Sequence, residues 1–303
     1  MIDIPNPARY AGGMKQRAQA LPGRGRGVLV TGCSSGIGRA VALGLADHGF
    51  TVFSTVRRDS DRKDLEALGK PGLVVICPFD LRRREHIAPL VKAVEGELAS
   101  RGQPGLYAIV NNGGGGSVAP LELVDLDGFR GELEARLVGP VALAQALLPS
   151  LRRAEGRLVW IATPALIPIP FVASIHACDF AANCITRTFA LELKPWGIPS
   201  VFVRCGGIDT AAPGKNAREL EQALAAWPDA RRSLYEQALK KESESLAAFD
   251  AKRSDPAVVA EKVLAALVAR RPRRVYRCGY LSGAAAILDL LPQPLVDRIM
   301  SRR

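Results

Sequence analysis

The sequence predicts an α/β fold, in which a doubly wound sheet of about seven parallel strands carries helices on both faces. Two observations predict it. Short apolar runs alternate with segments whose apolar residues recur at helical spacing, from residue 27 to about residue 210. The first run also passes into a helix through a glycine-rich turn. Strands joined through helices lie parallel, and helices then cover both faces of the sheet.

Each element follows from its local pattern. The run "GVLVTG" predicts the first strand, and the apolar spacing of the helix after it stops at Gly49, a residue type that often ends helices. Further apolar runs predict strands at 51–56, 73–81, 107–116, 156–163 and 199–210. Helical spacing predicts helices at 61–68, 84–100, 131–151, 174–193 and 255–269, the last with Pro256 in its first turn.

The expected organisation is one large domain with appendages. Residues 1–25 are rich in Gly, Pro and Arg without periodicity, which predicts a flexible N-terminal arm. Residues 26–303 form the domain itself. Within it, the polar, alanine-rich stretch at about 211–250 predicts a helical insertion that covers a substrate at the carboxyl edge of the sheet. Residues from about 272 to 303 form a C-terminal extension.

Composition excludes several classes of protein. The 303 residues are 48% hydrophobic and 23% charged, with neither a membrane-length apolar run nor a signal-peptide pattern, so we expect a soluble, cytoplasmic chain. The formal net charge is +11, but the basic clusters lack interleaved aromatic residues, so no nucleic-acid partner is expected. The six cysteines form no C-x-x-C pair, and no metal site is expected.

The C-terminal segment "AAAILDLLPQPLVDRIMSRR" permits two interpretations. Its apolar clusters beside a basic end are compatible with peripheral contact on a membrane surface. Packing against the domain or a sister subunit is favoured, because Pro292 and Pro294 interrupt any long amphipathic helix.

The segment "TGCSSGIG" follows a strand and opens a helix, which is the context of a dinucleotide-binding turn. Gly32 permits the tight turn, Gly36 lets the backbone approach a pyrophosphate, and Gly38 lets the helix pack closely on the strand. The helix N-terminus then stabilises the phosphate charge. The expected contacts are Thr31, Gly32, Ser34, Ser35, Gly36, Ile37 and Gly38.

Four motifs follow one another along the chain: "TGCSSGIG", "NNGG" at 111–114, "FALELKPWGI" at 189–198 and "GGIDT" at 206–210. In order and spacing they resemble the short-chain dehydrogenases/reductases. The stretches "VLVTGCSSGIGRAVA" and "VFSTVRR" are most similar to the hydroxysteroid and retinol dehydrogenase branch. The resemblance implies a Rossmann-type fold, a nicotinamide dinucleotide cofactor and, in an active member, hydride transfer at a carbonyl group.

The end of the second strand favours NADP(H) over NAD. Arg57 and Arg58 stand there with no acidic residue before Asp59, and a cation at this place accommodates a 2′-phosphate. Alternatively, Arg57 is only a solvated loop residue.

The resemblance also implies the remaining nucleotide contacts. Asp80, followed by Leu81, matches the aspartate that contacts the adenine, and Thr210 matches the residue that meets the nicotinamide carboxamide. The loop beneath the adenosine ribose is expected at Asn111, Asn112, Gly113 and Gly114.

The catalytic motif implied by the resemblance is missing. It comprises a tyrosine that exchanges a proton, a lysine four residues later, a serine after the fifth strand and an asparagine on the preceding helix. Aligning "TRTFALEL" without a gap puts Ile175 at the tyrosine position and Asp179 at the lysine position. Arg136 stands at the asparagine position, and Ala162 or Thr163 at the serine position. We therefore expect standard carbonyl reduction to be absent or very weak.

Three residues are candidate catalytic groups: His176, Asp179 and Thr163. A shift of one residue brings His176 to the tyrosine position, although a structural histidine is the favoured interpretation. The family's asparagine and lysine approach each other, so we expect Arg136 and Asp179 to form an ion pair.

Three functions stay open. The favoured one is a non-redox step, such as cyclisation, dehydration or isomerisation, on a small apolar carbonyl compound, with NADP(H) in a structural or vestigial role. The second is a catalytically silent subunit that pairs with an active relative. The third is hydride transfer with another proton donor, such as His176. A homodimer, a homotetramer or a hetero-oligomer is expected, through the helices around 131–151 and 175–193.

Overall fold

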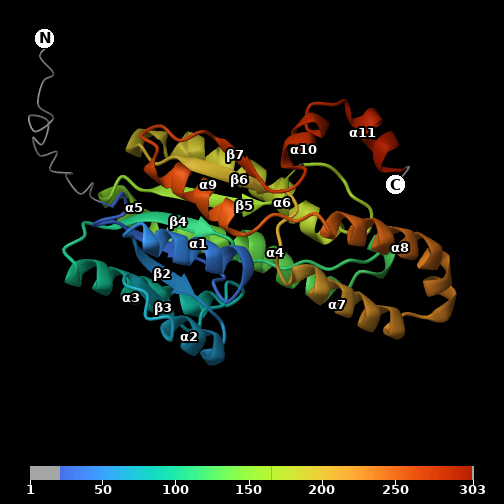
Figure 1. Cartoon of the computed structure of the whole chain (residues 1–303), viewed down its shortest axis with the longest axis horizontal. Helices are drawn as coiled ribbons and strands as arrows, with labels where there is room; N and C mark the ends of the chain where they lie inside the picture. The colour runs from blue at the N-terminus through green and yellow to red at the C-terminus, as the bar shows by residue number, and fades with distance from the viewer. Residues whose placement is uncertain (1–20, 165, 302–303) are drawn as a thin grey trace, which may run out of the picture.

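The computed structural model describes residues 21–164 and 166–301, and it contains one parallel sheet (Figure 1). Most of the expected N-terminal arm lies outside the described residues. The strand order is β3-β2-β1-β4-β5-β6-β7. The strands are β1 (Gly27–Val30), β2 (Thr51–Thr55), β3 (Leu73–Ile76), β4 (Leu106–Asn111), β5 (Arg157–Ala162), β6 (Ser200–Cys205) and β7 (Val275–Cys278). The predicted doubly wound fold is confirmed.

Helices connect the strands and cover both faces of the sheet. They are α1 (Gly36–Asp47), α2 (Asp59–Glu66), α3 (Ile87–Ser100), α4 (Leu126–Leu133), α5 (Gly139–Arg153), α6 (Ala173–Glu192), α7 (Ala212–Ala226), α8 (Asp229–Asp250), α9 (Ala257–Val268), α10 (Ser282–Leu288) and α11 (Gln293–Met300). One buried cluster joins the sheet to α1 and α9, and another joins it to α3, α5 and α6. Leu143 and Leu147 of α5 are fully buried in the second cluster, where each leucine stabilises the fold by about 2 kcal/mol.

Several elements of the structure differ from the prediction. The strand β7 is absent from the prediction, because only Cys278 of its four residues is buried and no apolar run marks it. The strand β4 ends at Asn111 rather than continuing through the glycines. The helix expected at 131–151 is instead α4, a π-helical segment at Glu134–Val138, and α5. Asp125 caps the N-terminus of α4, and its carboxylate accepts hydrogen bonds from the N–H groups of Asp127 and Gly128.

The C-terminal half adds structure beyond the sheet. Figure 1 shows α7 and α8 projecting on the side toward which the strand arrows point, and α10 and α11 lying beyond β7. A small buried cluster joins α10 and α11 to the loop after β5, through Ala285, Val296, Met300 and Ile167. Among the described residues, no helix has the length and apolar character that a membrane crossing requires.

Candidate functional site

The glycine turn between β1 and α1 has the shape that the sequence predicts. Gly32 and Gly36 have φ angles of +71° and +55°, a region that favours glycine. At Gly38, an added Cβ would lie 2.1 Å from the carbonyl oxygen of Gly32. The start of α1 therefore sits directly on the turn, and a side chain at residue 38 would separate them.

Hydrogen bonds fasten this turn to the end of β4. The hydroxyl of Thr31 accepts bonds from the backbone N–H groups of Asn112 and Gly113, at 2.9 and 3.0 Å. The side-chain amide of Asn112 donates to the carbonyl oxygen of Thr31 at 3.0 Å. Asn112 and Thr31 thus hold the two loops together, so that part of their role is structural.

Other predicted nucleotide residues gather at the same edge. An added Cβ at Gly36 would lie 3.1 Å from Cγ2 of Thr210, which places the segment after β6 beside the turn. An added Cβ at Gly113 would lie 2.9 Å from Cδ1 of Leu81. The structure therefore brings Thr210, Leu81 and Gly113 together around the turn.

The charged residues beyond β2 and β3 differ in whether another side chain already binds them. Arg58 donates to the carboxylate of Asp61 through two bonds of 2.8 and 2.9 Å. The exposed Arg57 has no hydrogen bond or ion pair with another described residue. Asp80 is bound by the Arg82 guanidinium at 2.6 and 3.0 Å, and this contact lowers the pKa of the carboxyl group to about 2. Arg57 is therefore the cation best placed for a further partner.

Substituting Gly38 with alanine is expected to lower the free energy of unfolding by about 2 kcal/mol or more, because the new methyl group would overlap the backbone of Gly32. Urea unfolding measures this change. The matched control is Gly96→Ala in the exposed middle of α3, where an added Cβ meets nothing within 4 Å. The control is expected to stabilise the protein slightly, and equal effects at the two positions would contradict the expectation.

The position expected for the catalytic tyrosine is closed by an apolar side chain. Ile175 lies in the first turn of α6, and an added Cβ at Gly116 would lie 2.1 Å from its Cγ1 atom. The isoleucine side chain thus packs directly on the glycine loop after β4. It has no atom that can exchange a proton.

One turn later, Asp179 forms the ion pair that the sequence predicts. Its Oδ1 atom lies 2.7 Å from the Arg136 guanidinium, and its Oδ2 atom accepts a bond of 3.0 Å from the backbone N–H of Thr163. The Arg136 side chain is 16% exposed and that of Asp179 is 4% exposed. Arg136 also donates to the carbonyl oxygen of Gly115 at 2.7 Å. The predicted ion pair is confirmed, and it ties together the loops after β4 and β5.

The π-helical segment between α4 and α5 explains how Arg136 reaches this place. A π turn adds one residue to a helix and changes the direction of the side chains within it. Arg136 is the third of the five residues in this turn. Nothing in the local sequence marks the turn, which is why the prediction gave one continuous helix.

His176 is buried beside the ion pair but is not part of its hydrogen bonds. The residue is 7% exposed, and its Nδ1 atom has no partner among the described residues. Burial lowers the pKa of the imidazole, although the Asp179 carboxylate acts in the opposite direction. His176 is therefore a neutral group close to the candidate site.

Acidification is expected to destabilise the protein through His176. The lowered pKa means that the unfolded chain binds a proton at a higher pH than the folded chain does, so stability is lost as the pH falls below about 6.5. His176→Gln should reduce the loss of unfolding free energy between about pH 7.5 and pH 5.5. Urea unfolding at both pH values checks this, and an identical pH dependence in the two proteins would refute it.

A second charged cluster lies near the site and was not predicted. Asp289, directly after α10, accepts bonds of 2.8 Å from the guanidinium groups of Arg204 and Arg277 and from the backbone N–H of Leu166. The cluster attaches α10 to β6, β7 and the loop after β5. The signal in the sequence was the arginine inside the apolar run "VFVRC".

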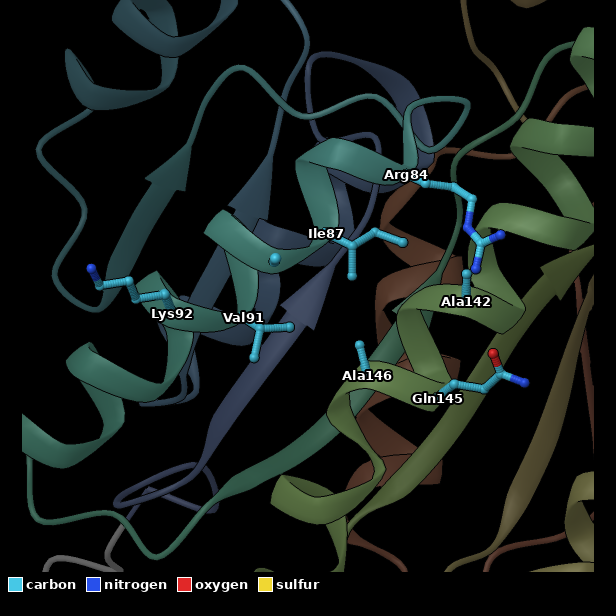
Figure 2. A pocket seen from close by; sticks show the side chains of 8 residues that line it. Arg84, Ile87, Val91, Lys92, Ala142, Gln145 and Ala146 are labelled. Carbon is cyan, nitrogen blue, oxygen red and sulfur yellow. The ribbon is translucent and has the colours of Figure 1, made fainter.

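An open groove of about 650 Å³ lies between α3 and α5 (Figure 2). Ile87, Val91 and Ala146 give it an apolar floor, and Arg84 and Lys92 also line it. None of the predicted site residues lines this groove, so it is separate from the candidate site.

The sequence matches the family model of the short chain dehydrogenases over residues 26–221. It is 32% identical to 11-beta-hydroxysteroid dehydrogenase type 2 of Oryctolagus cuniculus, over 94% of this chain and 71% of that enzyme. It is 30% identical to the short-chain dehydrogenase ptmH of Penicillium ochrochloron, over 90% of this chain and 96% of that protein.

Solved structures agree at the level of the fold. A short chain dehydrogenase from Burkholderia cenocepacia in complex with NADP has a TM-score of 0.68 at 20% identity, with 91% of this chain and 98% of that chain covered. The glycine turn, the strand order and the sequence matches lead to one conclusion: the chain belongs to the short-chain dehydrogenase/reductase family.

Proposed function

We propose that this protein binds NADP(H) and carries out a non-redox step, such as cyclisation, dehydration or isomerisation, on a small apolar carbonyl compound. The observation that carries the proposal is the Arg136–Asp179 ion pair, with Asp179 on the same helix one turn after Ile175. These residues stand where the family's asparagine, lysine and tyrosine are expected. The charges of Arg136 and Asp179 neutralise each other.

The nucleotide half of the site fits NADP(H). Gly36 and Gly38 put no side chain at the N-terminus of α1, where an added Cβ would meet Thr210 and Gly32, and the backbone N–H groups there suit a pyrophosphate. The guanidinium of Arg57, which has no partner among the described residues, suits a 2′-phosphate. In family members with a complete catalytic set, the bound cofactor supplies or accepts a hydride. The similarity to a dehydrogenase structure in complex with NADP supports the same assignment.

The remaining polar groups suit proton movement rather than hydride transfer. His176 is a neutral imidazole, Asp179 offers a carboxylate and Thr163 a hydroxyl. Beyond β6, the Phe249 and Tyr280 rings lie 5.6 Å apart, and Phe249 contacts Gly207. We propose this pair as part of the surface that contacts the carbon skeleton of a substrate.

Arg57 is expected to set the preference for NADP(H). Arg57→Ala should weaken NADPH binding by about tenfold and leave NADH binding unchanged, because a charge-assisted bond to the phosphate contributes about 1.5 kcal/mol. Arg58→Ala is the matched control, since Arg58 is already paired with Asp61. Titration of both variants with both cofactors measures the effect. An equal loss for NADPH and NADH would exclude this role.

Turnover assays with a panel of apolar ketones, aldehydes and hydroxyketones test the proposed reaction. We expect product without consumption of NADPH, detected by mass spectrometry, and its loss in His176→Gln or Asp179→Asn. Asp179→Asn keeps an acceptor for the N–H of Thr163 and so limits damage to the fold. NADPH oxidation at the rate of an ordinary ketone reductase would overturn the proposal.

A silent subunit is the second candidate function, and one surface favours it. Phe180, Leu191 and Trp196, on and just after α6, are 44%, 68% and 48% exposed. Exposed apolar side chains gathered in one segment are typical of a surface that packs against another chain. Co-purification with a relative that carries the complete catalytic set, without turnover by this chain alone, would favour this function over the first.

A further inference from the structure

Two cysteines stand side by side where the last two strands of the sheet end. Cys205 is the last residue of β6, Cys278 is the last residue of β7, and the two are register partners. Their Sγ atoms lie 3.8 Å apart, close enough for one thiol to donate a hydrogen bond to the other. Both thiols are free, and no step of the proposed function uses them.

The backbone holds this pair at the spacing that a disulfide requires. Neighbouring strands lie about 4.8 Å apart, and disulfides join Cα atoms that are about 4.4–6.8 Å apart. The pairing continues beyond the strand ends, because the N–H of Gly206 donates to the carbonyl oxygen of Cys278 at 2.8 Å and that of Gly207 donates to Tyr280 at 3.0 Å. On such a backbone, side-chain rotation and a small shift of the strand ends bring the two sulfurs to bonding distance.

The pair contains one sulfur suited to attack an oxidant and one suited to complete the bond. The hydrogen bond from Cys205 and the positive charge of Lys262 lower the pKa of the Cys278 thiol, although burial acts in the opposite direction. The hydrogen bond and burial raise the pKa of Cys205. Because the thiolate is the nucleophile in sulfur oxidation, Cys278 is the first sulfur to react. Both cysteines are 7% exposed, whereas Cys33 is fully buried.

We propose that Cys205 and Cys278 form a reversible disulfide on exposure to a hydroperoxide. The Cys278 thiolate attacks one peroxide oxygen, so that an S–O bond forms, the O–O bond breaks, and the released oxygen takes up a proton as water or an alcohol. The Cys205 sulfur then attacks this sulfenic acid, the S–S bond forms, and the hydroxyl group leaves with the thiol proton as water. The two thiols lose two electrons, which the peroxide gains. A small thiol reduces the bond again by exchange.

The disulfide would attach the edge of the sheet covalently. β7 stands at the end of the strand order, and Cys278 is the buried residue among its four. The two cysteines are 73 positions apart, so the bond constrains a long loop of the unfolded chain. Oxidation therefore stabilises the folded protein, and this holds for any reaction at the candidate site.

Mass spectrometry of the unaltered protein tests the bond directly. The folded full chain is treated with hydrogen peroxide, the remaining thiols are alkylated during denaturation, and the digest is compared before and after addition of dithiothreitol. We expect one cross-linked pair of peptides that joins Cys205 to Cys278 and that dithiothreitol separates. Alkylation of both cysteines would overturn the proposal, and so would sulfinic acid at Cys278 without a cross-link.

Thermal unfolding tests the effect of the bond with matched variants. Oxidation should raise the Tm of the unaltered protein by about 5 °C or more, because the closed loop is long. Cys278→Ala keeps a small apolar side chain and lacks the sulfur, so oxidation should leave its Tm unchanged. Cys184→Ala removes an exposed cysteine of α6 and should keep the full rise. An unchanged or lower Tm in the oxidised unaltered protein, or an equal rise in Cys278→Ala, would refute the stabilising role.

Discussion

Asp179→Ala is expected to reduce the free energy of unfolding by about 3 kcal/mol. The substitution leaves the Arg136 guanidinium, which is 16% exposed, without its carboxylate partner. It also removes the acceptor of the Thr163 N–H, which is held in the loop after β5. An uncompensated buried charge costs more than the ion pair itself contributes, so the single substitution is worse than removing both charges. Urea unfolding of the purified variant measures the loss.

Two further variants make this expectation specific. The double variant Arg136→Leu, Asp179→Asn removes both charges and keeps an oxygen for the Thr163 N–H, so it should recover most of the lost stability. Arg130→Ala breaks an ion pair in which both side chains are more than 70% exposed, and it should change stability little. A loss below about 1 kcal/mol in Asp179→Ala would show that solvent already screens the buried pair.

The sequence predicted the elements whose signal is local. A glycine turn needs positive φ angles at fixed positions, and Gly32 and Gly36 supply them within one short segment. Helices cover both faces of the sheet, so β1 and β2 are buried along their whole length, and their apolar residues mark them without reference to a neighbouring strand. In contrast, β7 is recognised only through its register with β6, since Val275 is 39% exposed and Tyr276 and Arg277 are polar.

The sequence predicted the contacts of the candidate site that the family resemblance implies. It missed contacts between elements that lie far apart in the chain. The Arg136–Asp179 pair follows from two positions that approach each other in related proteins. Asp289 was missed, because its partners Arg204 and Arg277 reach it only where β6 and β7 meet the end of α10. The spacing of apolar residues also does not predict the extra residue of the π-helical segment.

Restoring the family's catalytic set is expected to create a ketone reductase. The variant combines Ile175→Tyr, Asp179→Lys, Arg136→Asn and Ala162→Ser. General acid–base catalysis contributes about 100-fold to 10,000-fold, so NADPH consumption with apolar ketones should rise at least about 100-fold over the unaltered chain. Absorbance of NADPH during turnover measures it.

The four changes must act together, for reasons visible in the structure. Asp179→Lys alone would place a second cation against Arg136 and deprive the Thr163 N–H of its acceptor. Ile175→Tyr alone would supply a phenol beside a carboxylate, which raises the pKa of the phenol and opposes proton release. The control set carries Ile175→Phe with the other three changes and should stay inactive, because its ring has no hydroxyl group. If the unaltered chain already reduces ketones as fast as the combined variant, Ile175 and Asp179 are not what separates this chain from its active relatives.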